Sequence, residues 1–350
     1  MRVVVAMSGG VDSSVAAALL KRQGYEVTGV TMQLLAGGRN ASAIEDARIA
    51  ADNLGIRHHV VDFTEVFQRE VIADFYDEYI RGRTPNPCIR CNRYIKFGAL
   101  LEKARELGGD FLATGHYARV DGSGGSYLLK TGTDHGKDQS YFLYTLTQEQ
   151  LRQVLLPLGA LTKRQVREIA AGLGLAAGKP ESRDICFIPN SDYPEFLKEH
   201  LPEAATPGPI LDSRGVVLGE HCGIIFYTIG QRRRLGIATG EPLYVTAIDR
   251  ERNAVIVGGK EEVYSQRLTA SRLNWIAGDM QETPLTATAR IRYRHPGAAA
   301  VVVPLESNQV QVEFRRPQPA VTPGQAVVFY KGDTVLGGGV IESEPVSRAD

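Results

Sequence analysis

One stretch near the N-terminus, RVVVAMSGGVDSSVAAALLKRQG, residues 2–24, decides the fold. It begins with an apolar run typical of a strand, and its second half carries Val15, Leu19 and Leu20 at helical spacing before the stop signal Gly24. Strand-like and helix-like runs continue to alternate through the first half of the chain. This alternation predicts an α/β fold with a doubly wound parallel sheet, which binds ligands at the carboxyl ends of its strands.

The loop between this strand and helix, AMSGGVDSS, has the composition of an anion-binding site. Gly9 and Gly10 permit positive φ, so successive backbone N–H groups can point at one anion, and the start of the helix adds its own N–H groups and dipole. Because a carboxylate repels a phosphate unless a cation lies between them, Asp12 indicates Mg²⁺. The alternative is a tight turn in which Ser and Asp cap the helix. The loop matches neither the Walker A motif nor GxGxxG.

Composition places the chain among ordinary globular proteins. Of its 350 residues 43% are hydrophobic, and 40 Lys plus Arg balance 40 Asp plus Glu. Any nucleic-acid binding must therefore use a local patch. The apolar run in MRVVVAMSGG is too short for a secretory signal, no run is long enough for a membrane span, and four cysteines in so long a chain favour reduced thiols. We expect a cytoplasmic protein without membrane association.

The alternation of strand-like and helix-like runs stops at LPEAATPGPI, residues 201–210, where Pro and Gly cluster as in a linker. Short β-rich runs with turn signals follow. We expect an N-terminal α/β domain over residues 1–204, a small β-rich central domain over 205–268 and a C-terminal β-barrel over 269–350.

The loop SGGVDS resembles the pyrophosphate loop of the ATP pyrophosphatases, which adenylate a substrate oxygen, release pyrophosphate and let a nucleophile displace AMP. From residue 3 to residue 343 the chain resembles one family of that superfamily, the tRNA-specific 2-thiouridylases. The motifs that carry this resemblance are GRTPNPCIRCNRYIKFG, ATGHYAR, KDQSYFLY, DICFIP, YTIGQRRRLGI, IRYRHPG and TPGQAVVFYKGDTVLGGGVI. The family's fold, an adenine-nucleotide hydrolase-like domain, a small central domain and a β-barrel, agrees with the division above.

The resemblance implies the activity of a tRNA-uridine 2-sulfurtransferase. ATP with Mg²⁺ would adenylate the 2-oxygen of the wobble uridine in a tRNA anticodon loop, pyrophosphate would leave, and a sulfur nucleophile would displace AMP. The family pattern places the ATP contacts on Ala6, Met7, Ser8, Gly9, Gly10, Val11, Asp12, Ser13, Met32 and Gly115.

The family's nucleophile and persulfide carrier match Cys91 and Cys186. The resemblance implies that a persulfide on Cys186, supplied by a donor protein, delivers sulfur to the base. Cys91 would then attack the carrier sulfur and leave a Cys91–Cys186 disulfide, which a thiol reductant reopens. Arg90, Arg93 and Lys96 would favour the Cys91 thiolate if they lie close to it.

The pair Cys88 and Cys91 leaves a second mechanism open. A zinc site would need four ligands, and the sequence has no second close pair of cysteines. Position 88 varies in the family, which also has Asp there. Cys88, Cys91 and Cys186 together could hold three irons of a [4Fe–4S] cluster. We prefer the persulfide route and keep the cluster as the alternative. Cys222 is expected to be a buried apolar thiol.

An anticodon-loop base can be splayed into a protein pocket. The resemblance implies base contacts at Asn86, Pro87 and Cys88 and further tRNA contacts at His116, Lys137, Asp138, Gln139, Arg292, Tyr293 and Gln325.

The segment ARIRYRH supports part of this surface on its own. At strand period two, Arg290, Arg292 and Arg294 share one face, and three aligned guanidiniums suit phosphates. A solvated barrel face is the alternative. The run QRRRLG, with its arginines at 232–234, is a second candidate patch.

Two other functions compete with thiolation. A ligase of the same superfamily would need a glutaminase domain or an amino-acid pocket, and the sequence shows no sign of either. A non-catalytic RNA- or nucleotide-binding regulator would need neither an intact SGGVDS loop nor both Cys91 and Cys186. An ATP/pyrophosphate exchange assay with and without tRNA separates the three.

Overall fold

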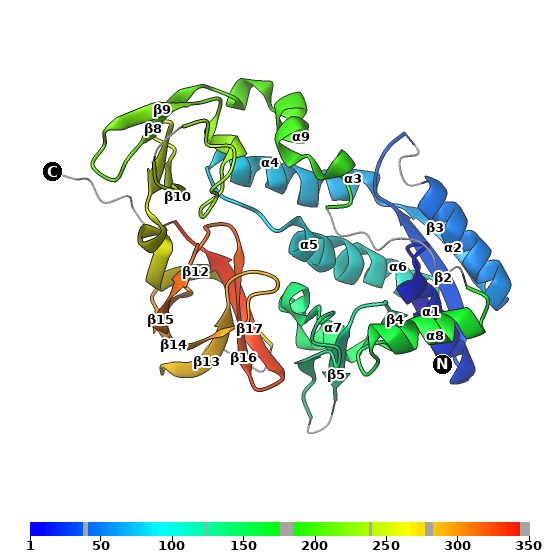
Figure 1. Ribbon diagram of the computed structural model, residues 1–350. Coiled ribbons are helices and arrows are strands. Elements are labelled where there is room, and N and C mark those ends of the chain that lie inside the picture. Colours follow the sequence, from blue (N-terminus) through cyan, green and yellow to red (C-terminus); the bar gives the residue numbers. More distant parts are fainter. Residues whose placement is uncertain (38–40, 123–124, 176–184, 238–239, 277–282, 344–350) are drawn as a thin grey trace.

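The computed structural model describes residues 1–37, 41–122, 125–175, 185–237, 240–276 and 283–343 (Figure 1). Its first unit is built on a sheet with the strand order β3-β2-β1-β4-β7. These strands are β1 (Arg2–Ala6), β2 (Glu26–Gln33), β3 (Arg57–Asp62), β4 (Phe111–Ala113) and β7 (Val154–Leu155). All of these pairings are parallel, which confirms the prediction from the alternating pattern.

Helices cover both faces of this sheet, as the side chains of β1 show. Val3 and Val5 are buried in one core, while Val4 and Ala6 are buried in another. The first core takes its helical residues from α1 (Val11–Arg22), α2 (Ala41–Leu54) and α8 (Lys163–Gly172), and the second includes residues of α6 (Leu100–Glu106). The sheet is therefore doubly wound, and the carboxyl ends of its strands are free to form a site.

Two longer helical segments each contain a π-helical stretch. The first consists of α3 (Thr64–Phe67), η1 (Gln68–Ile72) and α4 (Ala73–Ile80), and the second of α5 (Pro87–Arg90), η2 (Cys91–Ala99) and α6. In Figure 1 the second segment lies between the barrel and the parallel sheet. π-helical stretches often mark functional positions, and η2 begins at Cys91.

The central unit is a four-stranded sheet with the order β10-β11-β8-β9. Its strands are β8 (Gly208–Leu211), β9 (Val217–His221), β10 (Tyr244–Asp249) and β11 (Ala254–Gly258). The helix α9 (Tyr193–His200) precedes it. Short helical turns elsewhere are η3 (Ser140–Leu143), α7 (Gln148–Arg152), η4 (Pro189–Ser191), η5 (Pro202–Ala204), η6 (Ile224–Phe226) and η7 (Lys260–Val263).

The last unit is a closed antiparallel β-barrel, as expected. Its strands are β12 (Tyr264–Trp275), β13 (Leu285–Arg290), β14 (Ala298–Leu305), β15 (Gln309–Pro319), β16 (Ala326–Lys331) and β17 (Thr334–Ile341). They follow the order β12-β15-β14-β13-β16-β17, and pairing of β12 with β17 closes the ring. The barrel core is largely aliphatic, with Phe314 and Phe329 among its buried members.

Two details differ from a simple chain of three units. The boundary expected between residues 268 and 269 falls inside β12, which already pairs with β15 from Tyr264 onward. A hairpin of β5 (Ala118–Asp121) and β6 (Leu128–Thr131) also leaves the first unit and extends the barrel sheet, because β6 pairs with β17. Within the described part of the chain, no helix has the length and apolar character needed to span a membrane.

Candidate active site

The loop after β1 is held in a tight conformation that only glycine fits at one position. Gly9 has φ +74°, and a Cβ there would lie 2.4 Å from the carbonyl oxygen of Ala43 in α2. The hydroxyl of Ser13 accepts from the N–H of Ser8 at 3.1 Å and donates to the carbonyl of Gly10 at 3.0 Å. The loop is thus held by hydrogen bonds among its own residues and by close packing against α2.

This bracing leaves a row of free backbone N–H groups. Met7 N–H donates to the carbonyl of Val30, and Ser8 N–H to Ser13, so neither is available to a ligand. Residues 9–13 differ, because none of their N–H groups has an acceptor among the described residues. Consecutive free N–H groups at a helix start form an anion cradle. The resemblance implied phosphate contacts along residues 6–13, and the backbone N–H groups of residues 9–13 are the ones free to make them.

The carboxylate of Asp12 already has a cationic partner. Lys163, at the start of α8, donates from Nζ to both carboxylate oxygens at 2.7 Å and 2.8 Å, and the hydroxyl of Tyr117 donates to Oδ1 at 2.7 Å. Lys163 thus supplies the positive charge for which the sequence suggested Mg²⁺. With both oxygens engaged, Asp12 does not fit the role of a Mg²⁺ ligand in this arrangement.

Gly115, which follows β4, packs against the loop, and Met32 lies near the end of β2. A Cβ on Gly115 would lie 2.9 Å from the backbone nitrogen of Ser13, so the backbone after β4 packs directly on the cradle. Met32, near the end of β2, is half-buried between two cores. Both positions lie at the carboxyl edge of the sheet, where a nucleotide is expected.

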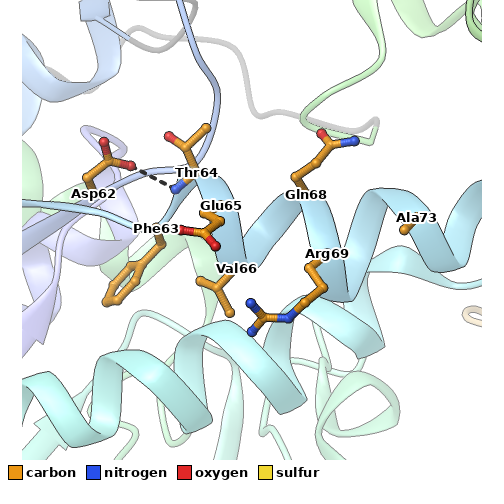
Figure 2. A pocket seen from close by; sticks show the side chains of 8 residues that line it. All are labelled: Asp62, Phe63, Thr64, Glu65, Val66, Gln68, Arg69 and Ala73. Carbon is orange, nitrogen blue, oxygen red and sulfur yellow. Dashed lines mark hydrogen bonds between the residues drawn. The ribbon is translucent and has the colours of Figure 1, made fainter.

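A cavity of about 810 Å³ opens where β3 ends (Figure 2). Its lining comes from the end of β3 and from α3 and η1, and it includes none of the residues predicted from the sequence: Asp62, Phe63, Thr64, Glu65, Val66, Gln68, Arg69 and Ala73. It adjoins the end of β2, because Phe63 N–H donates to the carbonyl of Gln33, the neighbour of Met32. The cavity is therefore beside the expected nucleotide position but is not lined by the thiols.

Packing explains how cysteines 95 residues apart in sequence come together. Phe187, the neighbour of Cys186, lies in an aromatic cluster with ring centroids 5.2 Å from Phe75 and 5.8 Å from Phe67. Cys91 is 8% exposed and belongs to the same core. Cys88 lies three residues before Cys91 on the same helical segment, so the fold brings the three cysteines that were predicted to act together into one region.

The thiols are neutral in this environment. Burial raises the pKa of Cys91 to about 12, and only the positive charge of Lys96 opposes that rise. Desolvation also raises the pKa of Cys88 and Cys186, although both side chains reach solvent. The expectation that Arg90 favours the thiolate is wrong, because its Nε donates to the carbonyl of Glu70 at 3.0 Å and pairs with a nearby carboxylate.

The cysteines do not form a metal centre as they are arranged. Among the described residues, no three His, Cys, Asp or Glu side chains are placed to hold a metal ion. Cys88, Cys91 and Cys186 all lie within the described ranges. They therefore form no site for a single metal ion, and we route no step through a cluster.

A loop of the barrel holds the segment that carries Cys88. Gln325 Nε2 donates to the carbonyls of Thr84 and Pro85 at 3.0 Å each, and Thr84 N–H donates to the carbonyl of Pro323 at 2.8 Å. Asn86 and Pro87 follow directly and start α5. The structure thus brings Gln325 to the three residues expected around the target base.

Two predicted tRNA contacts are engaged inside the protein. The carboxylate of Asp138 is buried and accepts from Gly132 N–H, Ser140 N–H, the Ser140 hydroxyl and Arg290 Nη1, at 2.8–3.1 Å. Gln139 Oε1 accepts from Tyr117 N–H at 3.0 Å. These bonds tie the first unit to the barrel, and they leave Asp138 no capacity for a tRNA contact.

His116 and Lys137 lie near these residues. Burial holds the pKa of His116 well below its ordinary range, and Lys96 acts in the same direction. Its Nδ1 lies 2.7 Å from the Thr114 hydroxyl, and its ring is 5.9 Å from that of Phe97. His116 is therefore a neutral, buried histidine beside the thiol-bearing helix, whereas Lys137 is half-buried in the turn that precedes Asp138.

The prediction of three arginines on one strand face is wrong. Strand β13 ends at Arg290, and Arg294 has φ 67°, which breaks the alternation. Arg290 pairs with Asp138, whereas Arg292 donates from Nη1 to the carbonyl of Pro319 at 3.0 Å. Tyr293 packs on Phe142 with ring centroids 4.4 Å apart.

The remaining predicted residues are Cys222 and the arginines at 232–234. Cys222 is exposed, so the prediction of a buried thiol is wrong. The arginines at 232–234 are all exposed in the central unit.

Sequence reasoning missed Lys163 and Tyr117 as partners of Asp12. It also missed Asn92, whose buried Oδ1 accepts no hydrogen bond from the described residues. The helical pattern after Thr162 could have indicated a lysine at a helix start, but not its partner.

Comparison with known proteins places this site in a family. Family models match in three consecutive parts: a tRNA methyl transferase HUP domain over residues 1–190, a PRC-barrel domain over 194–259 and an aminomethyltransferase β-barrel domain over 265–341. A tRNA-specific 2-thiouridylase MnmA from Halothermothrix orenii is 52% identical over 97% of this chain and 99% of its own length. The chain belongs to the tRNA-specific 2-thiouridylase family.

A second relative covers as much of the chain, whereas a solved structure covers less. The 2-thiouridylase from Moorella thermoacetica is 55% identical over 97% of this chain and 99% of its own length. A solved structure of the U34-tRNA thiolase NcsA from Methanococcus maripaludis with its [4Fe-4S] cluster is more distant, at 21% identity and a TM-score of 0.37 over 58% of this chain and 67% of that one.

Proposed function

We propose that this protein is a cytoplasmic, ATP-dependent tRNA-uridine 2-sulfurtransferase that acts on the wobble uridine. The observation that carries the proposal is that Cys88 and Cys91 lie on one helical segment, that Phe187 beside Cys186 shares the core of Cys91, and that the parallel sheet presents an anion cradle of free N–H groups. A 2-carbonyl oxygen is a poor leaving group, so its replacement needs both activation by ATP and a sulfur nucleophile. The two halves of this site match these two needs.

In the first step the cradle holds the phosphates of ATP. The N–H groups of residues 9–13 bind the phosphate oxygens, and Lys163 supplies positive charge beside them. The uracil 2-oxygen attacks the α-phosphorus, and the bond to pyrophosphate breaks. Mg²⁺ would accompany ATP and shield its phosphate charge, and we assign it no ligand among these residues.

In the second step sulfur replaces oxygen. The terminal sulfur of a persulfide on Cys186 attacks C2, and the C2–O bond breaks as AMP leaves with the oxygen. The thiolate of Cys91 then attacks Sγ of Cys186. The S–S bond breaks so that its electrons remain on the sulfur bound to C2, which becomes the thiocarbonyl. Cys91 and Cys186 are left as a disulfide, and a thiol reductant supplies the two electrons that reopen it.

The sulfane sulfur would come from a persulfide on a donor protein, and the substrate would be a tRNA anticodon loop. We propose that the base lies beside Asn86, Pro87 and Cys88, whose segment is held by Gln325. We also propose three functional units, 1–204, 205–263 and 264–350, with the last boundary moved from 268 to precede β12.

The names of the family models refer to methyl transfer, whereas the relatives are thiouridylases. The residues favour sulfur chemistry, because transfer of a methyl group from a methyl donor needs neither an adenylating loop nor gathered thiols. The test supplies the protein with a wobble-uridine tRNA transcript, ATP, Mg²⁺, a persulfide donor and a reductant. We expect 2-thiouridine by nucleoside mass spectrometry, dependent on ATP. A product methylated by an added methyl donor, without 2-thiouridine, would overturn the proposal.

A further inference from the structure

Lys96 is a half-buried cation without a partner in the described parts of the chain. It lies in η2, and no hydrogen bond or ion pair engages its ammonium there. Nearby cations differ: Arg90 pairs with Asp74, and Lys103 with Glu106 at 2.8 Å. Partial burial of an unpaired ammonium costs free energy, and that cost is offset when an anion comes to lie beside it.

The geometry of η2 turns Lys96 toward the thiols. In an α-helix, residues five apart point in widely different directions, whereas in a π-helix the i→i+5 hydrogen bond stacks them about one turn apart. Cys91 and Lys96 are five apart within η2, so the π-helical stretch brings their side chains to one side. The next residue, Phe97, contacts the ring of His116, which locates this side of the helix against the end of β4.

Four titratable groups from different elements are within the electrostatic reach of this ammonium. They are Cys88 on α5, Cys91 on η2, Cys186 and His116, and the charge of Lys96 acts on each of them. The charge favours the thiolates and opposes protonation of His116. Among the neighbouring arginines, Arg90 is paired and Arg93 is exposed and lies over the ring of Tyr94. None of the four groups is a carboxylate, so the cluster holds no permanent anion.

We propose that Lys96 is the positioning cation of the thiol cluster, which stabilises the anionic sulfur that forms there during sulfur transfer. This inference rests on the proposed function. The anions concerned are the terminal sulfur of the Cys186 persulfide and the thiolate of Cys91, whose protons pass to water. Because both attack as anions, a cation held beside them raises the fraction of the reactive form.

The test measures thiolate formation without tRNA or ATP. Cysteine alkylation by iodoacetamide is followed from pH 7 to pH 10 with site-resolved mass spectrometry in the wild type, Lys96→Met, Lys96→Gln and Lys96→Arg. Cys186 and Cys88 are the probes because they reach solvent, and exposed Cys222 is the internal control. Loss of a nearby opposite charge shifts a pKa by about one unit or more. We expect alkylation of Cys186 and Cys88 to slow about ten-fold at pH 8 in Lys96→Met and Lys96→Gln.

Alkylation of Cys222 should not change, and Lys96→Arg should stay within about two-fold of the wild type, since it keeps the charge. Lys103→Met is the matched lysine control, because its ammonium pairs with Glu106. Thermal unfolding confirms that each variant is folded. Equal alkylation of Cys186 and Cys88 in the wild type and both neutral variants would overturn the inference.

This readout separates the inference from the proposed function. If the wild type makes no 2-thiouridine but the thiol reactivity shifts as expected, the proposed function fails and the charge pairing stands. If the wild type makes 2-thiouridine and the reactivity does not shift, the inference fails alone. When both hold, thiolation by Lys96→Met should fall at neutral pH and recover partly as the pH rises.

Discussion

Lys163 Nζ lies 2.7 Å and 2.8 Å from the two carboxylate oxygens of Asp12, although the residues are 151 positions apart in the sequence. The pair joins the start of α8 to the start of α1, where the N–H groups of residues 9–13 are free. The protein therefore places its own cation at the edge of the proposed phosphate cradle. Asp12 holds that cation in place, which explains an acidic residue beside an anion site.

Replacing this lysine should weaken ATP binding. In Lys163→Met the carboxylate of Asp12 loses its counter-charge and repels the phosphates, so we expect at least a ten-fold higher Kd for ATP, about 1.4 kcal/mol. Because Asp12 is 33% exposed, unfolding free energy should fall by only about 1–2 kcal/mol. Isothermal titration calorimetry and urea unfolding measure the two effects. Arg164→Met, at an exposed neighbour, is the control. An unchanged ATP affinity in Lys163→Met would contradict this role.

Asp138 should prove structural. Asp138→Asn removes a buried carboxylate that accepts four hydrogen bonds and pairs with Arg290 at 2.8 Å. Breaking a buried pair leaves an unpaired charge, so unfolding free energy should fall by about 3 kcal/mol in urea titrations. Asp333→Asn breaks an exposed pair with Arg119 and should cost under about 1 kcal/mol. Normal stability with weakened tRNA binding in Asp138→Asn would restore the direct tRNA contact.

Arg292 stays a predicted tRNA contact. Each phosphate contact adds up to about one unit to the slope of log affinity against log salt. Arg292→Ala should therefore weaken tRNA binding and flatten that slope by about one unit, with ATP affinity unchanged. Filter binding over a salt series measures the slope. Arg267→Ala, which removes an arginine that pairs with Glu313, is the control. If the slope does not change, the bond to the Pro319 carbonyl is the whole role of Arg292.

Stability should fall in alkali. Burial raises the pKa of Cys91 from 9.0 to about 12, and the pKa of Tyr144 and Tyr330 from 10.0 to about 12. In that window the unfolded chain has released these protons and the folded chain still holds them, so unfolding free energy decreases as pH rises. The contribution is complete below about pH 9 and lost near pH 12. Urea midpoints at pH 8, 9.5 and 11 test this. A midpoint that is constant to pH 11 would show that these groups are not buried in solution.

The parallel sheet could be predicted from the sequence, because the spacing of apolar residues within each short segment distinguishes the strands β1 and β2 from the helix α1. The same spacing gave a wrong prediction where a strand ends earlier than the pattern of its residues suggests. The arginines at 290, 292 and 294 share a face only if the strand continues, but β13 ends at Arg290 and the backbone at Arg294 is left-handed. Resemblance named the cysteines, but their meeting depends on Phe187 packing on Phe75, a contact that no local pattern encodes. The same holds for Lys163 and Asp12.

The central claim is that a persulfide on Cys186 delivers sulfur to the base and Cys91 releases it by attacking Sγ of Cys186, without a cluster. Cys88→Ala, Cys91→Ala and Cys186→Ala should each be purified in air and assayed for 2-thiouridine per enzyme with ATP, tRNA and a persulfide donor. The assay is repeated after anaerobic incubation with iron and sulfide. Cys222→Ala, at an exposed cysteine between β9 and η6, serves as the control.

We predict that the wild type and Cys222→Ala are equally active in air, that Cys88→Ala retains substantial activity, and that Cys91→Ala and Cys186→Ala retain almost none. Iron and sulfide should add nothing. The account is contradicted if the wild type is inactive in air, iron and sulfide alone restore it, and Cys88→Ala fails together with the other two variants.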